Sequence, residues 1–126
     1  MAGLGLPKPV KFQLPGTPVN QSVSTVISAP GGTQTMLSYT VPVGSVATLY
    51  QAVVVTRAFT AFRVSVDGVL AGSGKTNTVE NNAGFTWSAG FVCTAGQQVL
   101  FTIVSRSDTP QGIDVEAYLQ MTVTGA

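Results

Sequence analysis

The sequence predicts an all-β domain, an antiparallel β-sandwich of about eight strands with jelly-roll or Greek-key topology and an extended N-terminal arm. Short runs rich in β-branched and aromatic residues recur about every 8–12 residues, separated by Gly, Pro or Asn. Several runs alternate apolar and polar side chains, which is the period of a half-buried strand. No segment has convincing helical periodicity, and 126 residues are enough for one domain with a core.

Residues 1–20 are expected to form the arm and residues 21–126 the sandwich domain. Four of the seven prolines lie in the arm, where each fixes φ and removes a backbone donor. An extended segment with regularly spaced apolar side chains can dock along a partner surface, which is the interpretation we favour. The alternatives are a disordered terminus or packing on its own domain. The residues expected to bind a partner are Leu4, Leu6, Pro7, Lys8, Val10, Lys11 and Phe12.

The first three strands of the domain are expected at residues 22–28, 33–41 and 46–56. The third is apolar on both faces, with Leu49, Val53 and Val55 opposite Tyr50, Ala52 and Val54. Such a run is typical of a strand in the middle of a sheet covered on both sides, or of a strand at an interface.

The next strand, at residues 62–66, places Phe62, Val64 and Val66 on one face. Asp67-Gly68 then predicts a tight hairpin turn, with residues 69–71 as a short partner strand. Residues 72–84 lose the apolar rhythm and are expected to form a long polar loop, of the kind that often carries function. Its candidate partner-binding residues are Lys75, Asn77, Glu80 and Asn81.

The last strands are expected at residues 85–93, 98–105 and 113–124, with a bulge at Ala89-Gly90 in the first of them. The final strand alternates most clearly. Its apolar face is predicted to comprise Val115, Ala117, Leu119, Met121 and Val123.

The charge content argues against several partners. Charged residues make up only 9% of the chain, and six Lys and Arg against five Asp and Glu leave a net charge of +1. This balance predicts no capture of nucleic acid or of anionic membrane. No apolar run is long enough for a membrane span or a signal peptide, so we expect synthesis in the cytosol. A surface with so few charges fits a protein that is covered by partners, although a free module would also tolerate it.

The sequence contains no complete catalytic or metal-binding motif, and we expect neither an enzyme nor a cofactor. The chain lacks His, and the single Cys93 is expected to be a buried structural thiol. Residues 72–76 resemble a phosphate-binding loop, but the first Gly of that pattern and the following helix are missing. Asp114 and Glu116 share a strand face and are expected to be solvated rather than a catalytic pair.

The aromatic residues leave two interpretations open. They are Tyr39, Tyr50, Phe85, Trp87 and Tyr118, and they belong either to the core or to a sugar-stacking face. The core is the interpretation we favour.

Four segments together resemble bacteriophage virion proteins built on a small jelly roll, a group that includes capsid decoration (cement) proteins, head fibres and tail-tip adhesins. The segments are Val41-Pro42-Val43-Gly44, residues 62–68, residues 94–99 and residues 115–119. The likeness covers residues 22–126 and transfers an architecture and a role, with no site motif.

The resemblance implies a non-enzymatic structural protein, often trimeric, that is made in the host cytoplasm and bound to the capsid exterior. Its partners would be the major capsid protein and other copies of itself, with the arm bridging capsid subunits. The alternatives are a tail-tip, baseplate or head–tail component, or a carbohydrate-binding β-sandwich module.

Overall fold

The computed structural model describes residues 16–28, 30–77 and 79–125, which form nine strands and no helix. The strands are β1 (Thr17–Pro18), β2 (Gln21–Val26), β3 (Thr33–Thr40), β4 (Ser45–Thr56), β5 (Thr60–Val66), β6 (Val69–Thr76), β7 (Asn82–Thr94), β8 (Gln98–Ser105) and β9 (Asp114–Gly125).

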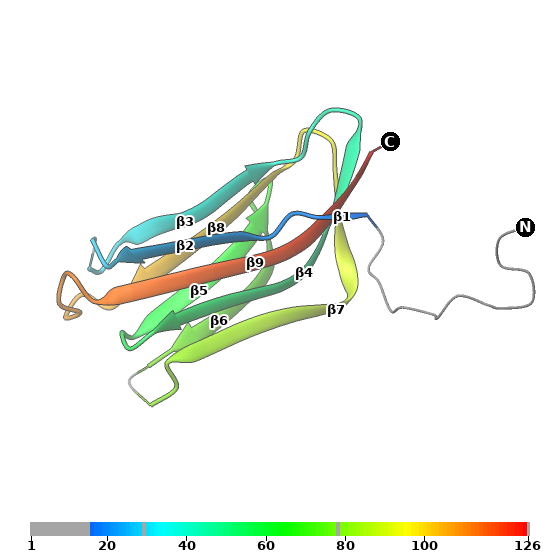
Figure 1. Ribbon diagram of the computed structural model, residues 1–126. Helices are drawn as coiled ribbons and strands as arrows, with labels where there is room; N and C mark the ends of the chain where they lie inside the picture. The colour runs from blue at the N-terminus through cyan, green and yellow to red at the C-terminus, as the bar shows by residue number, and fades with distance from the viewer. Residues whose placement is uncertain (1–15, 29, 78, 126) are drawn as a thin grey trace, which may run out of the picture.

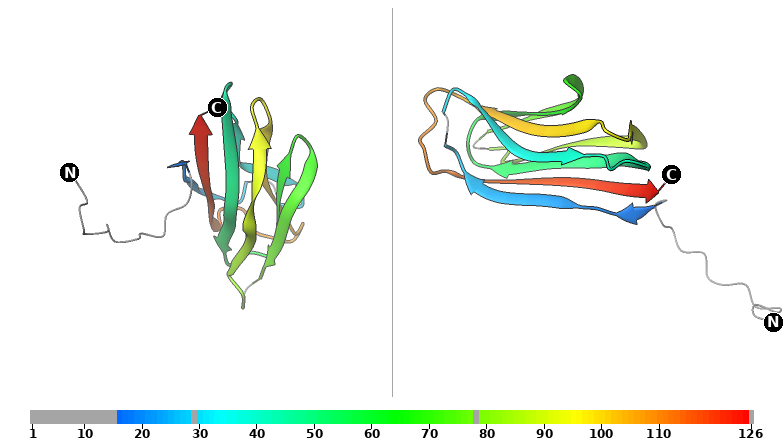
Figure 2. Two further views of the ribbon diagram at one scale, coloured as in Figure 1. Left: turned by 90° about the vertical axis from the view of Figure 1, so that its right-hand side faces the viewer. Right: turned by 90° about the horizontal axis from the view of Figure 1, so that it is seen from above.

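Two antiparallel sheets pack face to face (Figures 1 and 2). In sheet A, β1 and β2 both pair with one edge of β9, and β4 and β7 follow; sheet B has the order β3-β8-β5-β6. Apart from the two-residue β1, β2-β9-β4-β7 therefore faces β3-β8-β5-β6, which is the strand order of a jelly roll. The predicted fold class is confirmed.

The core lies between the sheets and is built from the inward face of each strand. Phe62 of β5 and Phe101 of β8 form its centre, with ring centroids 5.5 Å apart. The fully buried aliphatic side chains around them include Ile27, Val41, Leu49, Val54, Val64, Val99, Ile103, Val115, Leu119 and Met121.

The clearest alternating segments fold as predicted. In β9, the predicted apolar face is buried from Val115 to Met121, and in β5 the predicted face of Phe62, Val64 and Val66 is buried. Asp67 and Gly68 both have positive φ, 49° and 81°, as a type I′ turn requires. Val66 and Val69 pair across this two-residue turn.

The predicted faces of β4 are wrong because the strand contains a bulge. Its pairing register shifts between Leu49 and Gln51 on both sides, against β7 and against β9. The shift reverses the alternation, so Leu49 shares the buried face with Ala52 and Val54, while Val53 is only half-buried. The central position of β4 between β9 and β7 is as predicted.

The predicted polar loop at residues 72–84 is also wrong, since β6 continues to Thr76 and β7 begins at Asn82. The inward positions of β6 here are glycines, which removes the apolar rhythm from the sequence. A Cβ at Gly72 would lie 2.8 Å from the Phe85 ring and 2.9 Å from that of Trp87. The aromatic rings of neighbouring strands therefore fill the space that apolar β6 side chains would otherwise occupy.

The boundary predicted at residue 20 falls inside a continuous pairing with β9. Thr17 pairs with Val123 and Gln21 with Leu119 in one register, and the Val19 N–H donates to the Met121 carbonyl at 2.9 Å. The folded domain therefore already includes Thr17.

Replacing Gly74 should destabilise the sandwich, because a Cβ there would overlap the ring of Phe62. We expect Gly74→Val to lower the free energy of unfolding by roughly 1–3 kcal/mol, as overpacking of a core does. Ser73→Val is the control, because Ser73 is exposed on the same strand. Urea denaturation measures both, and equal stability of the two variants would contradict this packing.

Candidate functional site

The two ends of the sandwich differ in what they present to a partner (Figure 1). The loops that join β2 to β3, β4 to β5, β6 to β7 and β8 to β9 gather at one end, here called the loop end. The turns that join β3 to β4, β5 to β6 and β7 to β8 lie at the other end, together with β1 and the end of β9. This second end is called the turn end.

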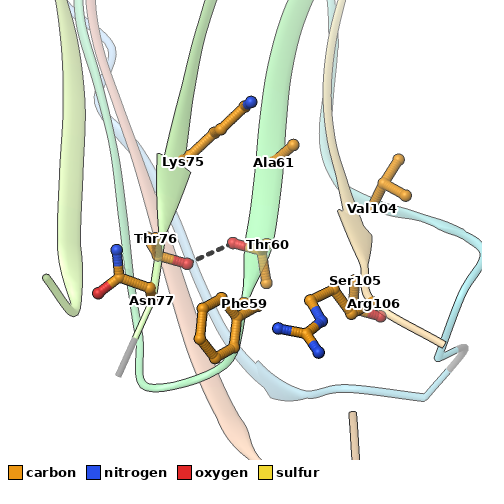
Figure 3. Close-up of a pocket in the computed structure, with 9 residues that line it drawn as sticks. All are labelled: Phe59, Thr60, Ala61, Lys75, Thr76, Asn77, Val104, Ser105 and Arg106. Carbon is orange, nitrogen blue, oxygen red and sulfur yellow. Dashed lines mark hydrogen bonds between the residues drawn. The ribbon is translucent and has the colours of Figure 1, made fainter. Parts of the chain in front are cut away.

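A pocket of about 480 Å³ opens at the loop end, on the outer side of sheet B (Figure 3). It is lined by Phe59, Thr60, Ala61, Lys75, Thr76, Asn77, Val104, Ser105 and Arg106. The hydroxyls of Thr60 and Thr76 lie 2.5 Å apart, and that of Thr76 also donates to the Ala58 carbonyl at 2.9 Å. These bonds tie the pocket floor to the loop between β4 and β5.

Arg106 and Phe59 form the rim of this pocket, and the sequence interpretation missed both. The Arg106 guanidinium lies 4.5 Å from the centroid of the Phe59 ring and donates to the Asp108 carboxylate at 2.6 Å. Both members of this ion pair are exposed, so it adds little to stability. The one signal in the sequence that pointed to this rim was the aromatic Phe59, which stands between the two strands β4 and β5.

The four predicted partner-loop residues reach the loop end but do not form one site. Lys75 and Asn77 line the pocket, whereas Asn81 lines a separate hollow of about 500 Å³ with Arg57, Asp114 and Glu116. The Asn77 side-chain oxygen accepts from the backbone N–H groups of Val79 and Glu80 at 2.8 and 2.7 Å. The side-chain oxygen of Asn77 therefore shapes the loop.

The turn end is joined by backbone hydrogen bonds between its three turns. The Val41 N–H donates to the Gln97 carbonyl at 2.9 Å, and the Asp67 N–H donates to that of Gln98 at 3.0 Å. Exposed apolar side chains flank these bonds: Val43 is 95% exposed, Val69 68% and Leu70 57%. These three residues are called the turn-end patch.

Asp114 and Glu116 lie two residues apart in β9 and both line the hollow of about 500 Å³ described above, where Asp114 is exposed. Glu116 accepts a hydrogen bond of 2.7 Å from the Tyr118 hydroxyl, and this bond is the main cause that raises the pKa of Tyr118. Within the described residues, no cluster of three or more His, Cys, Asp or Glu could hold a metal ion. The described part of the chain also contains no helix long and apolar enough to cross a membrane.

Cys93 is buried on the inner face of β7, as predicted for a structural thiol. Burial, with a smaller effect of the Asp67 carboxylate, raises the pKa of Cys93 to about 11. The reactive thiolate is therefore scarce at neutral pH.

The five aromatic residues considered for a sugar-stacking face do not share one. Phe85 and Trp87 of β7 pack against the core, and the Trp87 indole N–H donates to the Ala71 carbonyl of β6 at 3.0 Å. Tyr39 packs against the core from β3, and only Tyr118 is an exposed large side chain, on β9.

The predicted arm residues, from Leu4 to Phe12, lie outside the described residues. The described chain begins at the turn end, where a Cβ on Gly16 would lie 2.7 Å from the Thr124 side chain. Comparisons with protein-family models, curated proteins and solved structures find no match for this chain.

Proposed function

We propose that this protein is a virion structural protein, a capsid decoration (cement) protein that stabilises a phage head by bridging major capsid subunits. The observation that carries the proposal is the contrast between the two ends of the sandwich. The turn end combines an exposed apolar patch, very little charge and the point where the N-terminal segment joins the domain.

Charged side chains of the described residues are concentrated away from the turn end. Most line or adjoin the hollows of the loop end: Arg57, Lys75, Glu80, Arg106, Asp108, Asp114 and Glu116. Arg63 lies in the middle of β5, which leaves Asp67 at the turn end. The Asp67 carboxylate accepts a hydrogen bond from the Gln98 N–H at 2.9 Å and so stabilises the turn itself.

A surface of this kind suits a protein partner. The buried centre of a protein interface is depleted of charged residues, and contiguous exposed apolar side chains mark interaction sites. Val43 on one side of the turn between β7 and β8, and Val69 and Leu70 on the other, supply exposed apolar side chains at this end. The turn end therefore faces the capsid in this proposal, and the charged loop end faces solvent.

The N-terminal segment would extend the same contact. Residues 1–15 precede Gly16, which lies beside Thr124 at the turn end. Burial of Leu4, Leu6, Val10 and Phe12 against capsid subunits would contribute on the order of 1.5–3 kcal/mol each, before ordering costs. Association into trimers on the capsid exterior belongs to the same proposal, because a surface with few charges also tolerates packing between copies.

Addition of the purified protein to capsids that lack it tests this function. A protein that binds only the assembled shell raises the temperature at which the shell comes apart, because binding is linked to stability. We expect co-sedimentation with the capsids and a raised disassembly temperature. An unchanged disassembly temperature at saturating protein would contradict a cementing role.

A further inference from the structure

A groove of about 330 Å³ lies on the outer face of sheet A, away from both the loop-end pocket and the turn-end patch. It runs over β2, β9 and β4, and every residue that lines it is uncharged. The side chains used below are those of Asn20, Ser22, Gln51, Tyr118 and Gln120. This set is called the amide groove.

The bulge in β4 creates this groove. Without it, Gln51 would share the buried face of Leu49, two residues before it. The register shift instead leaves Gln51 exposed and makes it the cross-strand partner of Gln120 in β9. Bulges are often retained because they re-aim one side chain, and here the result is two outward glutamines side by side.

Tyr118 provides an aromatic surface next to the two amides. Its side chain is 43% exposed, and its cross-strand partners are Ser22 on one side and Val53 on the other. The 2.7 Å hydrogen bond from its hydroxyl to Glu116 holds the ring in place. A ring that is already oriented loses little conformational freedom when a ligand stacks on it.

The polar groups of the groove are available to a ligand. In the described part of the chain, the side-chain amides of Gln51 and Gln120 form no hydrogen bond with protein groups, so each offers two donors and an acceptor. The Asn20 side-chain oxygen lies 3.4 Å from the Met121 N–H and is directed at the backbone. The groove therefore combines paired amides and one hydroxyl with an aromatic face.

We propose that the amide groove binds a neutral saccharide. A pyranose ring has an apolar C–H face, which suits stacking on Tyr118, and a rim of hydroxyls that donate to and accept from amides such as Gln51 and Gln120. An anionic sugar is disfavoured, since the groove contains no cation and Glu116 lies beside Tyr118. Saccharide binding does not depend on capsid decoration, because the groove and the turn-end patch involve different residues.

Saturation-transfer NMR on the full chain tests the site. The probes are methyl α-glucopyranoside, methyl β-galactopyranoside and N-acetylglucosamine, with N-acetylneuraminic acid as the charged comparison. We expect transfer to the ring protons of at least one neutral sugar and none to the acid. Tyr118→Ala should weaken binding about tenfold, whereas Tyr118→Phe should retain most of it because the ring remains.

Matched glutamine variants separate the groove from general surface effects. Gln51→Ala and Gln120→Ala should each weaken binding, and Gln111→Ala, an exposed glutamine at the loop end, should not. Unchanged thermal unfolding shows that each variant is folded. If Tyr118→Ala does not fold, the two glutamine variants carry the test of the groove. Absence of transfer to every neutral probe, or unchanged binding by the folded groove variants, would overturn the proposal.

Discussion

Removal of residues 2–15 is expected to abolish capsid binding while the sandwich stays folded. The deleted segment carries the apolar side chains that the proposal buries across capsid subunits. The free energy of burial lost with them is expected to exceed the free energy that burial of the turn-end patch supplies alone. The fold should persist because the pairing with β9 already begins at Thr17. Co-sedimentation with capsids measures binding, and thermal unfolding measures the domain.

Point variants in the same segment distinguish apolar burial from charge. Leu6→Ser and Phe12→Ser should weaken capsid binding, whereas Lys8→Ala and Lys11→Ala should change it far less. Equal binding of the truncated and full chains would exclude the arm from the contact. If the lysine variants lost more binding than the apolar ones, electrostatic attraction would replace burial as the cause.

A carboxylate in the turn-end patch is expected to weaken capsid binding at least about tenfold, because the interface would then bury an unpaired charge. Val43→Asp and Val69→Asp are the test variants. Both positions are exposed in the free protein, so neither change should lower its stability.

Val79→Asp is the matched control for these variants. Val79 is 88% exposed, close to the 95% of Val43, but it lies in the loop between β6 and β7 at the opposite end. This variant should bind capsids as the unmodified protein does. Equal losses at Val43 and Val79 would show that added negative charge, rather than its position, weakens binding.

The sequence predicted those strands in which local pattern and tertiary environment agree. β5 and β9 each alternate buried apolar residues with more exposed ones, so a period of two is visible without knowledge of their neighbours. The turn at Asp67-Gly68 was predictable for a similar reason, since both residues tolerate the positive φ that a type I′ turn needs.

The missed features depend on contacts between strands that are distant in sequence. Gly72 and Gly74 occupy inward positions of β6 because aromatic rings from β7 and β5 fill that space, and nothing within residues 72–84 reveals those rings. Opposite the bulge in β4, strand β7 contains more residues between the paired positions than β4 does. The predicted bulge at Gly90 lies among these extra residues of β7. Its effect on Gln51 could not be foreseen from β4 alone.

The candidate sites were predictable only in part. Lys75 and Asn77 were expected in a partner loop and do reach the loop-end pocket. The pairing of Arg106 with Phe59 joins segments separated by β5, β6, β7 and β8, so it needed the strand order. The contrast between the charged and uncharged ends also depends on which loops share an end.

Copy number in purified virus particles tests the central claim most directly. Quantitative mass spectrometry would compare this chain with the major capsid protein in particles from the source. A decoration protein should be present in hundreds of copies, in a fixed ratio to the capsid subunit. A handful of copies would instead indicate a tail or neck component, and absence from the particles would contradict a virion role altogether.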